Sequence, residues 1–421
     1  MIKIFSFLKY KIKLICQNRL VAFLIGIYIG LSLKKISKQI SNKKNKVLIF
    51  SEKRWIQSLY ILKKNKELEL FSIPDKIFNQ INSLFRAKEY YLNTTSRKRK
   101  NEKIIFFRYK SDSYYLNKDS NILEERKRQR EFIKIIGNIL KKIFSIDCAL
   151  TCSFYYNQEQ EWAAGLTSAK IPFITIHKEQ SEFDNFQLDT FLNRLEEIKF
   201  KYQGDSILLP NKRMVKVFKK RDMFKNTYIN ATGIVKYDSL FKRIKKNKKK
   251  KKNISNILLT FGGFDRHKVN LKILKYLKFI KKKLKITLLV NRRDGYCNEI
   301  LKYSKKNKLF VNLLTNSSIV DVIHKVDFAI VSGGVTAKEL ILFDIPCFII
   351  STSNDQLNNC KKYKNLKKTR YLGHWNKIKK NLFINEVNNL FNKEKKILNK
   401  KEKRIFDFDG STRITKHILN L

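Results

Sequence analysis

The stretch that most constrains the fold of this chain is residues 326–350, which read VDFAIVSGGVTAKELILFDIPCFII. The apolar run 328–331 predicts a buried strand that ends at Ser332, Gly333 and Gly334. Residues 335–343 predict a helix that begins just after the glycines, and 346–350 predict the next buried strand. Such a unit places a helix N-terminus and bare N–H groups at the carboxyl edge of a parallel sheet. The sequence therefore predicts a phosphate-binding site here.

Strands and helices alternate along most of the chain. Further strands are predicted at 46–50, 68–73, 104–108, 171–176, 206–209, 228–231, 256–261, 286–291 and 310–314, with helices at 55–63, 122–144, 162–168, 271–279 and 319–324. This alternation is typical of α/β domains with parallel sheets, and 421 residues suffice for two of them. We expect two Rossmann-like domains that face a cleft, preceded by an apolar and basic helical extension.

A lysine-rich run, KRIKKNKKKKK at 242–252, divides the chain. Like charges repel one another and cannot pack, so the run is predicted to be a linker. The predicted parts are a membrane-associating segment (1–42), a first domain on the acceptor side (43–241), the linker (242–253), a nucleotide-sugar-binding domain (254–405) and a C-terminal helix (406–421).

The net charge is extreme, since 91 Lys and Arg residues face 36 Asp and Glu residues and give +55. A polyanionic partner would explain such a charge, either an anionic membrane surface or nucleic acid. Lysine, asparagine and isoleucine are abundant throughout, however, so a compositional bias explains much of it. No recognition module is present and the aromatic residues do not interleave with the charge runs, so we expect no specific nucleic-acid partner.

The N-terminal region contains an uncharged apolar stretch, LVAFLIGIYIGLSL at 20–33, after a mixed basic and apolar segment. As a helix it would rise about 21 Å, less than the ~30 Å of a hydrocarbon core. We therefore expect a peripheral or N-terminal anchor at the cytoplasmic face of the inner (plasma) membrane. A single tilted span and a helix packed on the protein's own surface are the alternatives.

The six cysteines are scattered, and the pair Cys148 and Cys152 lacks a second pair at zinc spacing. We expect reduced thiols and no metal site.

Two glycine pairs follow predicted strands, Gly262-Gly263 after ILLTF and Gly333-Gly334 after FAIVS. If both lie at the carboxyl ends of strands in one domain, they converge on one crevice suited to a diphosphate. Two tight turns without a ligand would give the same pattern. Glu339, one turn into the helix, could accept hydrogen bonds from ribose hydroxyls or simply compensate the helix dipole.

Several of these motifs resemble the nucleotide-sugar domain of two-domain glycosyltransferases of the GT-B superfamily. They are TFGGFD (260–265), SGGVTAKE (332–339), the apolar strand with Pro346, and SNDQ (353–356). They are similar to the patterns of the lipid-II-forming N-acetylglucosaminyltransferase and of the nucleotide-sugar hydrolase of pseudaminic acid synthesis. FDFDGSTRI (406–414) resembles the ending of that hydrolase group, and AAGLTSAKIPFITIHKEQ (163–180) and NATGIVKYD (230–238) resemble first-domain segments of the transferase.

The resemblance implies roles for individual residues. Gly333, Gly334 and Thr336 would contact the diphosphate, Glu339 the ribose, and Asn354 or Gln356 the sugar. Gly262, Gly263 and Asp265 would close the crevice from the other strand. His177 would act as a base or position the acceptor, with Glu179 beside it as a second catalytic candidate, although an ordinary strand-end histidine is an equal alternative for His177.

One departure from these families concerns the first domain, because the glycine-rich G-x-G-H loop is missing and SEKRW follows KVLIF. This leaves the catalytic base and the acceptor undefined and disfavours a faithful copy of the hydrolase. The leading hypothesis is a metal-independent transferase without a cofactor. It would move a sugar from a nucleotide-sugar, by the family's habit a UDP-sugar, to a lipid-linked or surface-polysaccharide acceptor. A nucleotide-sugar hydrolase or 2-epimerase of the same fold is the alternative.

Overall fold

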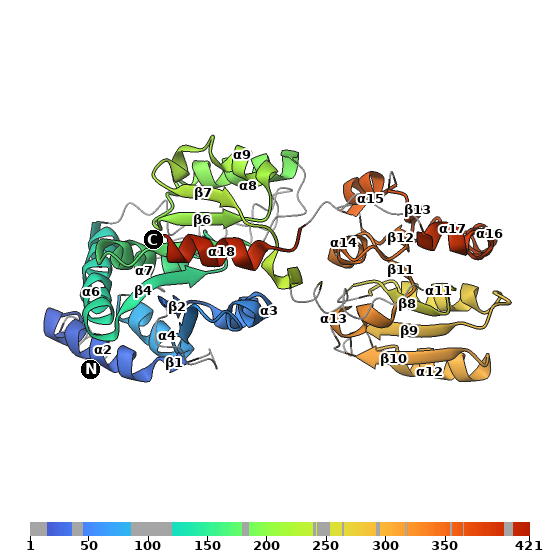
Figure 1. Cartoon of the computed structure of the whole chain (residues 1–421), viewed down its shortest axis with the longest axis horizontal. Coiled ribbons are helices and arrows are strands. Elements are labelled where there is room, and N and C mark those ends of the chain that lie inside the picture. The colour runs from blue at the N-terminus through green and yellow to red at the C-terminus, as the bar shows by residue number, and fades with distance from the viewer. Residues whose placement is uncertain are drawn as a thin grey trace, which may run out of the picture. The chain divides into compact units, whose positions relative to one another are not determined.

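The computed structural model describes residues 15–35, 45–85, 120–178, 185–238, 241, 253–262, 265–291, 295–315, 317, 319–353, 356–364, 366–399 and 407–421. The chain forms two compact units (Figure 1). Unit 1 contains Met1–Asp238 and Phe408–Leu421, and unit 2 contains Ser239–Asp407. The predicted strand 104–108, the whole lysine-rich run (242–252), Glu179, Gly263 and Asn354 lie outside the described residues.

Unit 1 is built on a seven-stranded sheet with the order β1-β3-β2-β4-β5-β6-β7. All neighbouring strands are parallel except the short edge strand β1, which pairs antiparallel with β3. β5 and β6 are buried along their whole length, as expected for a parallel sheet covered by helices on both faces. The strands are β1 Lys34–Lys35, β2 Asn45–Ile49, β3 Leu68–Ser72, β4 Ile146–Thr151, β5 Phe173–Ile176, β6 Ser206–Leu209 and β7 Tyr228–Ala231.

The helices of unit 1 connect and cover these strands. The longest, α6, packs against both α2 and α7 along one face of the sheet (Figure 1). The helices are α2 Arg19–Ser32, α3 Glu52–Leu62, α4 Asp75–Leu84, α6 Ser120–Phe144, α7 Asn157–Ser168, α8 Asn185–Glu197, α9 Lys212–Phe218 and α18 Gly410–Leu419, with 3₁₀ turns at Asp222–Phe224 and Val235–Tyr237. Among the described residues, none of the helices is long and apolar enough to cross a membrane.

Unit 2 has a six-stranded, wholly parallel sheet with the order β10-β9-β8-β11-β12-β13. Its strands are β8 Asn256–Thr260, β9 Lys285–Val290, β10 Phe310–Thr315, β11 Phe328–Ser332, β12 Cys347–Ser351 and β13 Thr369–His374. Its helices are α11 Val269–Leu277, α12 Cys297–Lys306, α13 Ile319–Val322, α14 Val335–Leu342, α15 Leu357–Tyr363, α16 Lys380–Asn392 and α17 Glu394–Asn399, with a 3₁₀ turn at Ile323–Lys325. The predicted pair of Rossmann-like domains is thus confirmed, whereas the cleft between them stays a prediction.

The end of the chain returns to unit 1, where α18 lies with the first sheet (Figure 1). The Arg413 guanidinium donates two hydrogen bonds to the carbonyl of Thr232, at 3.0 and 2.8 Å. The N–H of Ser411 donates to Asp238 at 2.6 Å. A side chain at Gly410 would lie 2.9 Å from the same Thr232 carbonyl, so this position requires glycine. The motif at 230–238 therefore packs with residues 408–414 of the second motif as parts of unit 1.

Both sheets have a topological switch point, where the chain reverses its direction across the sheet. In unit 1 it runs from β2 outward to β3 and then returns to β4 on the other side of β2. In unit 2 it runs from β8 through β9 to β10 and then returns to β11 on the other side of β8. The connections diverge at such a point and leave a crevice at the carboxyl ends of the two central strands, where open α/β sheets bind ligands.

Candidate functional site

The two glycine turns of unit 2 meet at its switch point. β8 and β11 are neighbours, with Thr260 paired to Val331, so both strands end at the same level of the sheet. The hydroxyl oxygen of Ser332 lies 3.9 Å from where a Cβ would stand on Gly262 and equally far from that of Gly334. Gly262 has φ +92°, a conformation that favours glycine. The structure therefore brings Gly262 and the turn Ser332–Gly334 together at neighbouring strand ends, and the crevice suited to a diphosphate stays a prediction.

The adjacent glycines of the second turn serve different purposes. A Cβ on Gly333 would lie 2.2 Å from the sulfur of Cys360, so this position lets α15 approach the turn. Among the described residues, a Cβ on Gly334 would meet no atom closer than 3.9 Å. The space in front of Gly334 is thus open, while the space at Gly333 is filled by the protein itself.

Gly334 is the N-cap of α14 and, being glycine, provides no capping side chain for the first N–H groups of the helix. Gln356 lies beside it. The Gln356 amide oxygen accepts hydrogen bonds from the N–H groups of Gly333 at 3.1 Å and Thr352 at 3.0 Å. Its amide nitrogen lies 3.9 Å from the Cβ position of Gly334. Together the helix N-terminus and this amide give the open side of the turn the donors that an anion requires.

The other predicted residues of unit 2 are distributed around this turn. Thr336 is half-buried in the first turn of α14, and Glu339 is buried further along the same helix. Asp265 is buried as well, and its carboxylate accepts the N–H groups of Val269 and Asn270, at 2.9 and 2.8 Å. The Tyr296 hydroxyl donates to it at 2.6 Å. Asp265 therefore binds the N-terminus of α11, and the roles predicted for these residues toward a ligand stay predictions.

His177 lies in unit 1 at the end of β5, where only 2% of it is exposed. Its ring packs edge-on against Phe154, with the ring centroids 4.8 Å apart. Its backbone N–H donates to the carbonyl of Leu208. It also lines a pocket of about 350 Å³ that includes Lys53, Arg54 and the segment 233–236. The structure thus gives His177 an aromatic environment beside a pocket, and its catalytic role stays a prediction.

A group of polar residues at the switch point of unit 1 was missed by the sequence analysis. Ser51 follows β2, Thr151 ends β4, and Glu159 lies in the first turn of α7. The hydroxyl of Ser51 donates to one carboxylate oxygen of Glu159, and Thr151 donates to the other at 2.5 Å. Burial raises the pKa of Glu159 to about 7, although both hydroxyls and the Arg54 cation counteract the rise.

These residues were missed because nothing in the local sequence connects them. Serine, threonine and glutamate are ordinary at strand ends and in first helical turns. Ser51 and Glu159 are also separated by most of the first domain. The one available signal was that Ser51 follows the predicted strand 46–50, whereas the strand before Glu159, β4, was not predicted.

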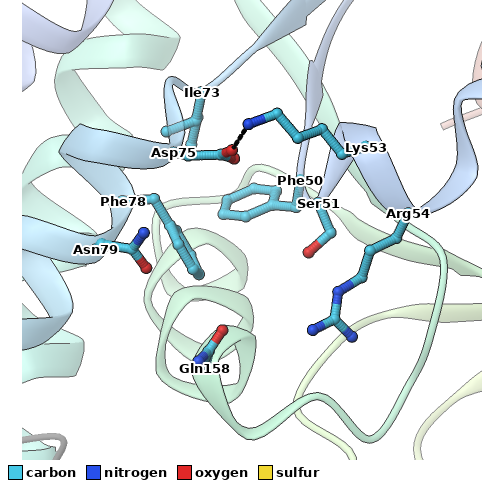
Figure 2. Close-up of a pocket in the computed structure, with 9 residues that line it drawn as sticks. All are labelled: Phe50, Ser51, Lys53, Arg54, Ile73, Asp75, Phe78, Asn79 and Gln158. Carbon is cyan, nitrogen blue, oxygen red and sulfur yellow. Dashed lines mark hydrogen bonds and ion pairs between the residues drawn. The ribbon is translucent and has the colours of Figure 1, made fainter.

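The pocket next to this group has a volume of about 210 Å³ (Figure 2). It is lined by Phe50, Ser51, Lys53, Arg54, Ile73, Asp75, Phe78, Asn79 and Gln158. Lys53 forms an ion pair with Asp75 at 2.6 Å across one side of it. Arg54 lies over the ring of Tyr156, with the guanidinium carbon 4.3 Å from the ring centroid.

Among the described residues, no three His, Cys, Asp or Glu side chains are arranged to hold a metal ion. The expectation of a metal-independent reaction without a cofactor stays a prediction.

Comparison with protein families and with curated proteins finds no match. Among solved structures, the chain resembles MurG from Acinetobacter baumannii, with 12% identity, coverage of 70% of this chain and 80% of that one, and a TM-score of 0.42. It also resembles a UDP-N-acetylglucosamine 2-epimerase from Rickettsia bellii, with 14% identity, 90% and 96% coverage, and a TM-score of 0.45. A third is Anabaena HepE in complex with UDP-glucose, with 11% identity, 68% and 82% coverage, and a TM-score of 0.38.

The chain thus resembles GT-B enzymes among solved structures as well as in its motifs. At these identities and TM-scores the similarity says nothing about activity. The assignment of two Rossmann-like domains rests on the chain's own strand orders and registers.

Proposed function

We propose that this chain is a glycosyltransferase of the GT-B type that uses a nucleotide-sugar, most simply a UDP-sugar, as donor. The observation that supports this proposal is the meeting of Gly262 with the turn Ser332–Gly334 at the switch point of unit 2. The N-terminus of α14 opens directly onto that turn. A diphosphate is the ligand that such a turn suits best, because its charge is matched by N–H groups and by the helix dipole.

The chemistry follows from this arrangement. In sugar transfer the bond between the anomeric carbon and the phosphate oxygen breaks, and negative charge develops on the departing diphosphate. Fixed N–H donors and a helix N-terminus stabilise that charge without a metal ion. We therefore expect turnover to persist in EDTA, with Thr336, Glu339 and Gln356 contacting the rest of the donor.

Substitution of Gly334 by aspartate tests the donor site. Its carboxylate would occupy the open space in front of α14 and repel a diphosphate, weakening UDP binding by about 100-fold or more. Isothermal titration calorimetry with UDP measures the effect. Asn381→Asp, which adds the same charge to an exposed position on α16, is the matched control and should bind UDP like the wild type. Equal affinity in Gly334→Asp and the wild type would refute the site.

The reaction itself is tested by product analysis of UDP-sugars with and without an acceptor. A transferase produces UDP slowly until an acceptor is added. Release of free sugar or a 2-epimer without any acceptor would instead assign the chain to the hydrolase or epimerase alternative.

We further propose that the acceptor is lipid-linked or a surface-polysaccharide precursor and that the protein acts at the cytoplasmic face of the membrane. The feature that supports this is α2. Its Ala22, Gly26 and Ile29 are buried, and Gly26 and Gly30 lie against Ile139 and Phe144 of α6. Its opposite face exposes apolar side chains, which are Leu20, Phe23, Leu24, Tyr28 and Leu31. A helix held on the protein with an apolar face outward is suited to lie in a membrane interface, and the +55 charge favours anionic lipid.

Sedimentation with vesicles tests this localisation. Replacing both Leu24 and Leu31 by glutamate should lower binding to vesicles containing phosphatidylserine by about tenfold or more, since each leucine loses its apolar burial. Leu382→Glu, at an exposed position on α16, is the control. Vesicle binding that falls with salt but is unchanged by the α2 substitutions would contradict a role for the exposed apolar face of α2 in membrane binding.

A further inference from the structure

The pocket of about 210 Å³ in unit 1 lies where three helices begin. α3, α4 and α7 follow the adjacent parallel strands β2, β3 and β4, and each contributes lining residues from its first turns. The pocket therefore lies at the carboxyl edge beside the switch point of this sheet, the place where an open α/β sheet binds a ligand.

The lining suits a carbohydrate ring. Phe50 and Phe78 provide aromatic surface, with their ring centroids 5.9 Å apart and their planes at 77°. Asn79 and Gln158 contribute amide groups, and Arg54 contributes a guanidinium (Figure 2). Apolar and aromatic walls with a few polar groups are typical of small-ligand sites, and hydroxyl groups are recognised by such amides and cations.

Ser51 connects this pocket to a buried carboxyl. Its hydroxyl lines the pocket and donates its proton to Glu159, so its oxygen lone pairs remain able to accept a hydrogen bond from a ligand hydroxyl. Thr151 holds the second oxygen of Glu159 at 2.5 Å. Ser51 also has φ +50° in the turn between β2 and α3, a conformation unusual for a residue other than glycine.

A purely structural role for Glu159 would explain its bonds to β4 and to the turn after β2. It would not explain why the hydroxyl at the strained position faces a pocket with a carbohydrate-like lining. A glycine at position 51 would adopt the same backbone freely. Serine at this position thus adds a hydroxyl at the cost of backbone strain.

We infer that this pocket binds the hydroxyl-bearing acceptor of the proposed transfer, a pyranoside, and that Ser51 takes the proton of the attacking hydroxyl while Glu159 takes the proton of Ser51. The acceptor oxygen forms the new bond to the anomeric carbon of the donor. The bond from that carbon to the phosphate oxygen breaks, and its electron pair leaves with the nucleotide diphosphate. Ser51 is the catalytic residue, and Glu159, which acts through it, is a positioning residue that stores the proton until solvent removes it.

Glu159 must be ionised to take this proton, so the step should accelerate as the pH rises. Two titratable groups interact with this carboxyl, Arg54 from α3 and Tyr202 from the segment before β6. Tyr156 and Cys152, from the loop between β4 and α7, act on Arg54. Arg54 lowers the pKa of Glu159. Its removal should therefore move the rising limb of the pH profile to higher pH.

The first test measures the acceptor pocket alone, because the inference rests on the proposed function and must be separable from it. The full chain is mixed with the methyl glycosides of glucose, galactose, mannose and N-acetylglucosamine, and binding is measured by saturation-transfer NMR. Phe78→Ala and Ser51→Gly should each lower the affinity for whichever glycoside binds by about fivefold or more. Gly334→Asp, which removes only the donor site, should leave it unchanged. Absence of binding by all four glycosides overturns the inference while leaving the donor site in place.

The second test uses UDP release with that glycoside as acceptor. The wild-type rate should rise with pH through an apparent pKa near 7, and Arg54→Gln should shift this limb upward. Glu159→Gln should slow release by about 100-fold or more and abolish the limb, while UDP affinity remains that of the wild type. Glu67→Gln, at an exposed position of the same unit, is the control.

Ser51→Gly keeps the test decisive if Glu159→Gln fails to fold, because glycine suits the backbone at this position. The rate of UDP release by Ser51→Gly should likewise no longer rise with pH. A Ser51→Gly variant with the wild-type rate and pH profile overturns the inference.

Discussion

The switch points of the two units have the same topology and opposite chemistry. In unit 2 the central strands β8 and β11 end in Gly262 and in Ser332–Gly334, and the space in front of them is bounded by backbone and by a helix N-terminus. In unit 1 the central strands β2 and β4 end in Ser51 and Thr151, which hold the buried carboxyl of Glu159. One crevice thus offers fixed donors to an anion, and the other offers a proton acceptor.

The first strand–helix turn of each unit makes this difference specific. Gly262 has φ +92° and Ser51 has φ +50°, so both turns require a residue with a positive φ angle. Glycine adopts it without cost, whereas serine does so at about 1–2 kcal/mol. The fold dictates the shape of the turn, and the residue placed there decides its chemistry.

The largest predicted effect concerns Glu159. Its pKa is about 7 in the folded chain against an ordinary value of 4.5, so the folded state holds this proton more tightly than the unfolded state does. Its contribution to the free energy of unfolding is therefore complete below pH about 4.5 and is lost as the pH rises through about 7. The loss is about 3 kcal/mol, at roughly 1.4 kcal/mol per pH unit.

Guanidinium unfolding at a series of pH values, with hydrogen exchange of peptides from unit 1 as the readout, measures this slope. Glu159→Gln is uncharged at every pH and should lack it, while Glu67→Gln should keep it. If the free energy of unfolding had the same pH dependence in Glu159→Gln and the wild type, the titrating group would lie elsewhere. Unit 1 would then lack the proton acceptor that distinguishes it from unit 2.

The second effect is on the turn of unit 2. Gly333→Ala would place a methyl group 2.2 Å from the sulfur of Cys360, so α15 or the turn must move. We expect a loss of about 2 kcal/mol in the free energy of unfolding of unit 2, in the range of other overpacked cores. Hydrogen exchange of peptides from α14 and α15 reports it. A variant as stable as the wild type would show that the close approach at Gly333 is unnecessary.

Most strands of both units were predicted from their apolar runs, although the central strand β4, Ile146–Thr151, was not. The strands at 206–209 and 228–231 were predicted with their observed bounds, and the one at 328–331 differs from β11 by a single residue. β13, Thr369–His374, was missed because it is an edge strand without a fully buried residue, so no continuous apolar run marks it.

The same physical difference explains why one crevice was predicted and the other was not. Gly262 and Gly333-Gly334 change the backbone locally, so glycine pairs after apolar runs are visible in the sequence. Ser51, Thr151 and Glu159 act through side chains that come together only when β2 and β4 become neighbours. Their residue types are common at strand ends and in first helical turns, so only the topology identifies them.

A third effect should be smaller. Asp265→Asn removes a buried carboxylate that accepts two N–H groups of α11 and the Tyr296 hydroxyl, but its amide oxygen can still accept one of them. We expect a loss of about 1 kcal/mol in the stability of unit 2. Its UDP affinity should change little if Asp265 acts only on its own loop. A large loss of affinity with intact stability would instead support the direct ligand contact that the resemblance implies.

The smallest effect is expected from the residue next to Gly333. Gly334→Ala adds a methyl group that would lie no closer than 3.9 Å to any atom of the part of the chain that the structure describes, at φ −88°, which any residue adopts. The free energy of unfolding should therefore change by less than about 0.5 kcal/mol. UDP affinity, measured by calorimetry, should fall because the methyl group occupies the space where the diphosphate approaches the N-terminus of α14. Gly333→Ala and Gly334→Ala thus separate packing from binding within one turn. If Gly334→Ala destabilised unit 2 as much as Gly333→Ala, both glycines would be packing residues, and the turn would no longer have an open side for an anion.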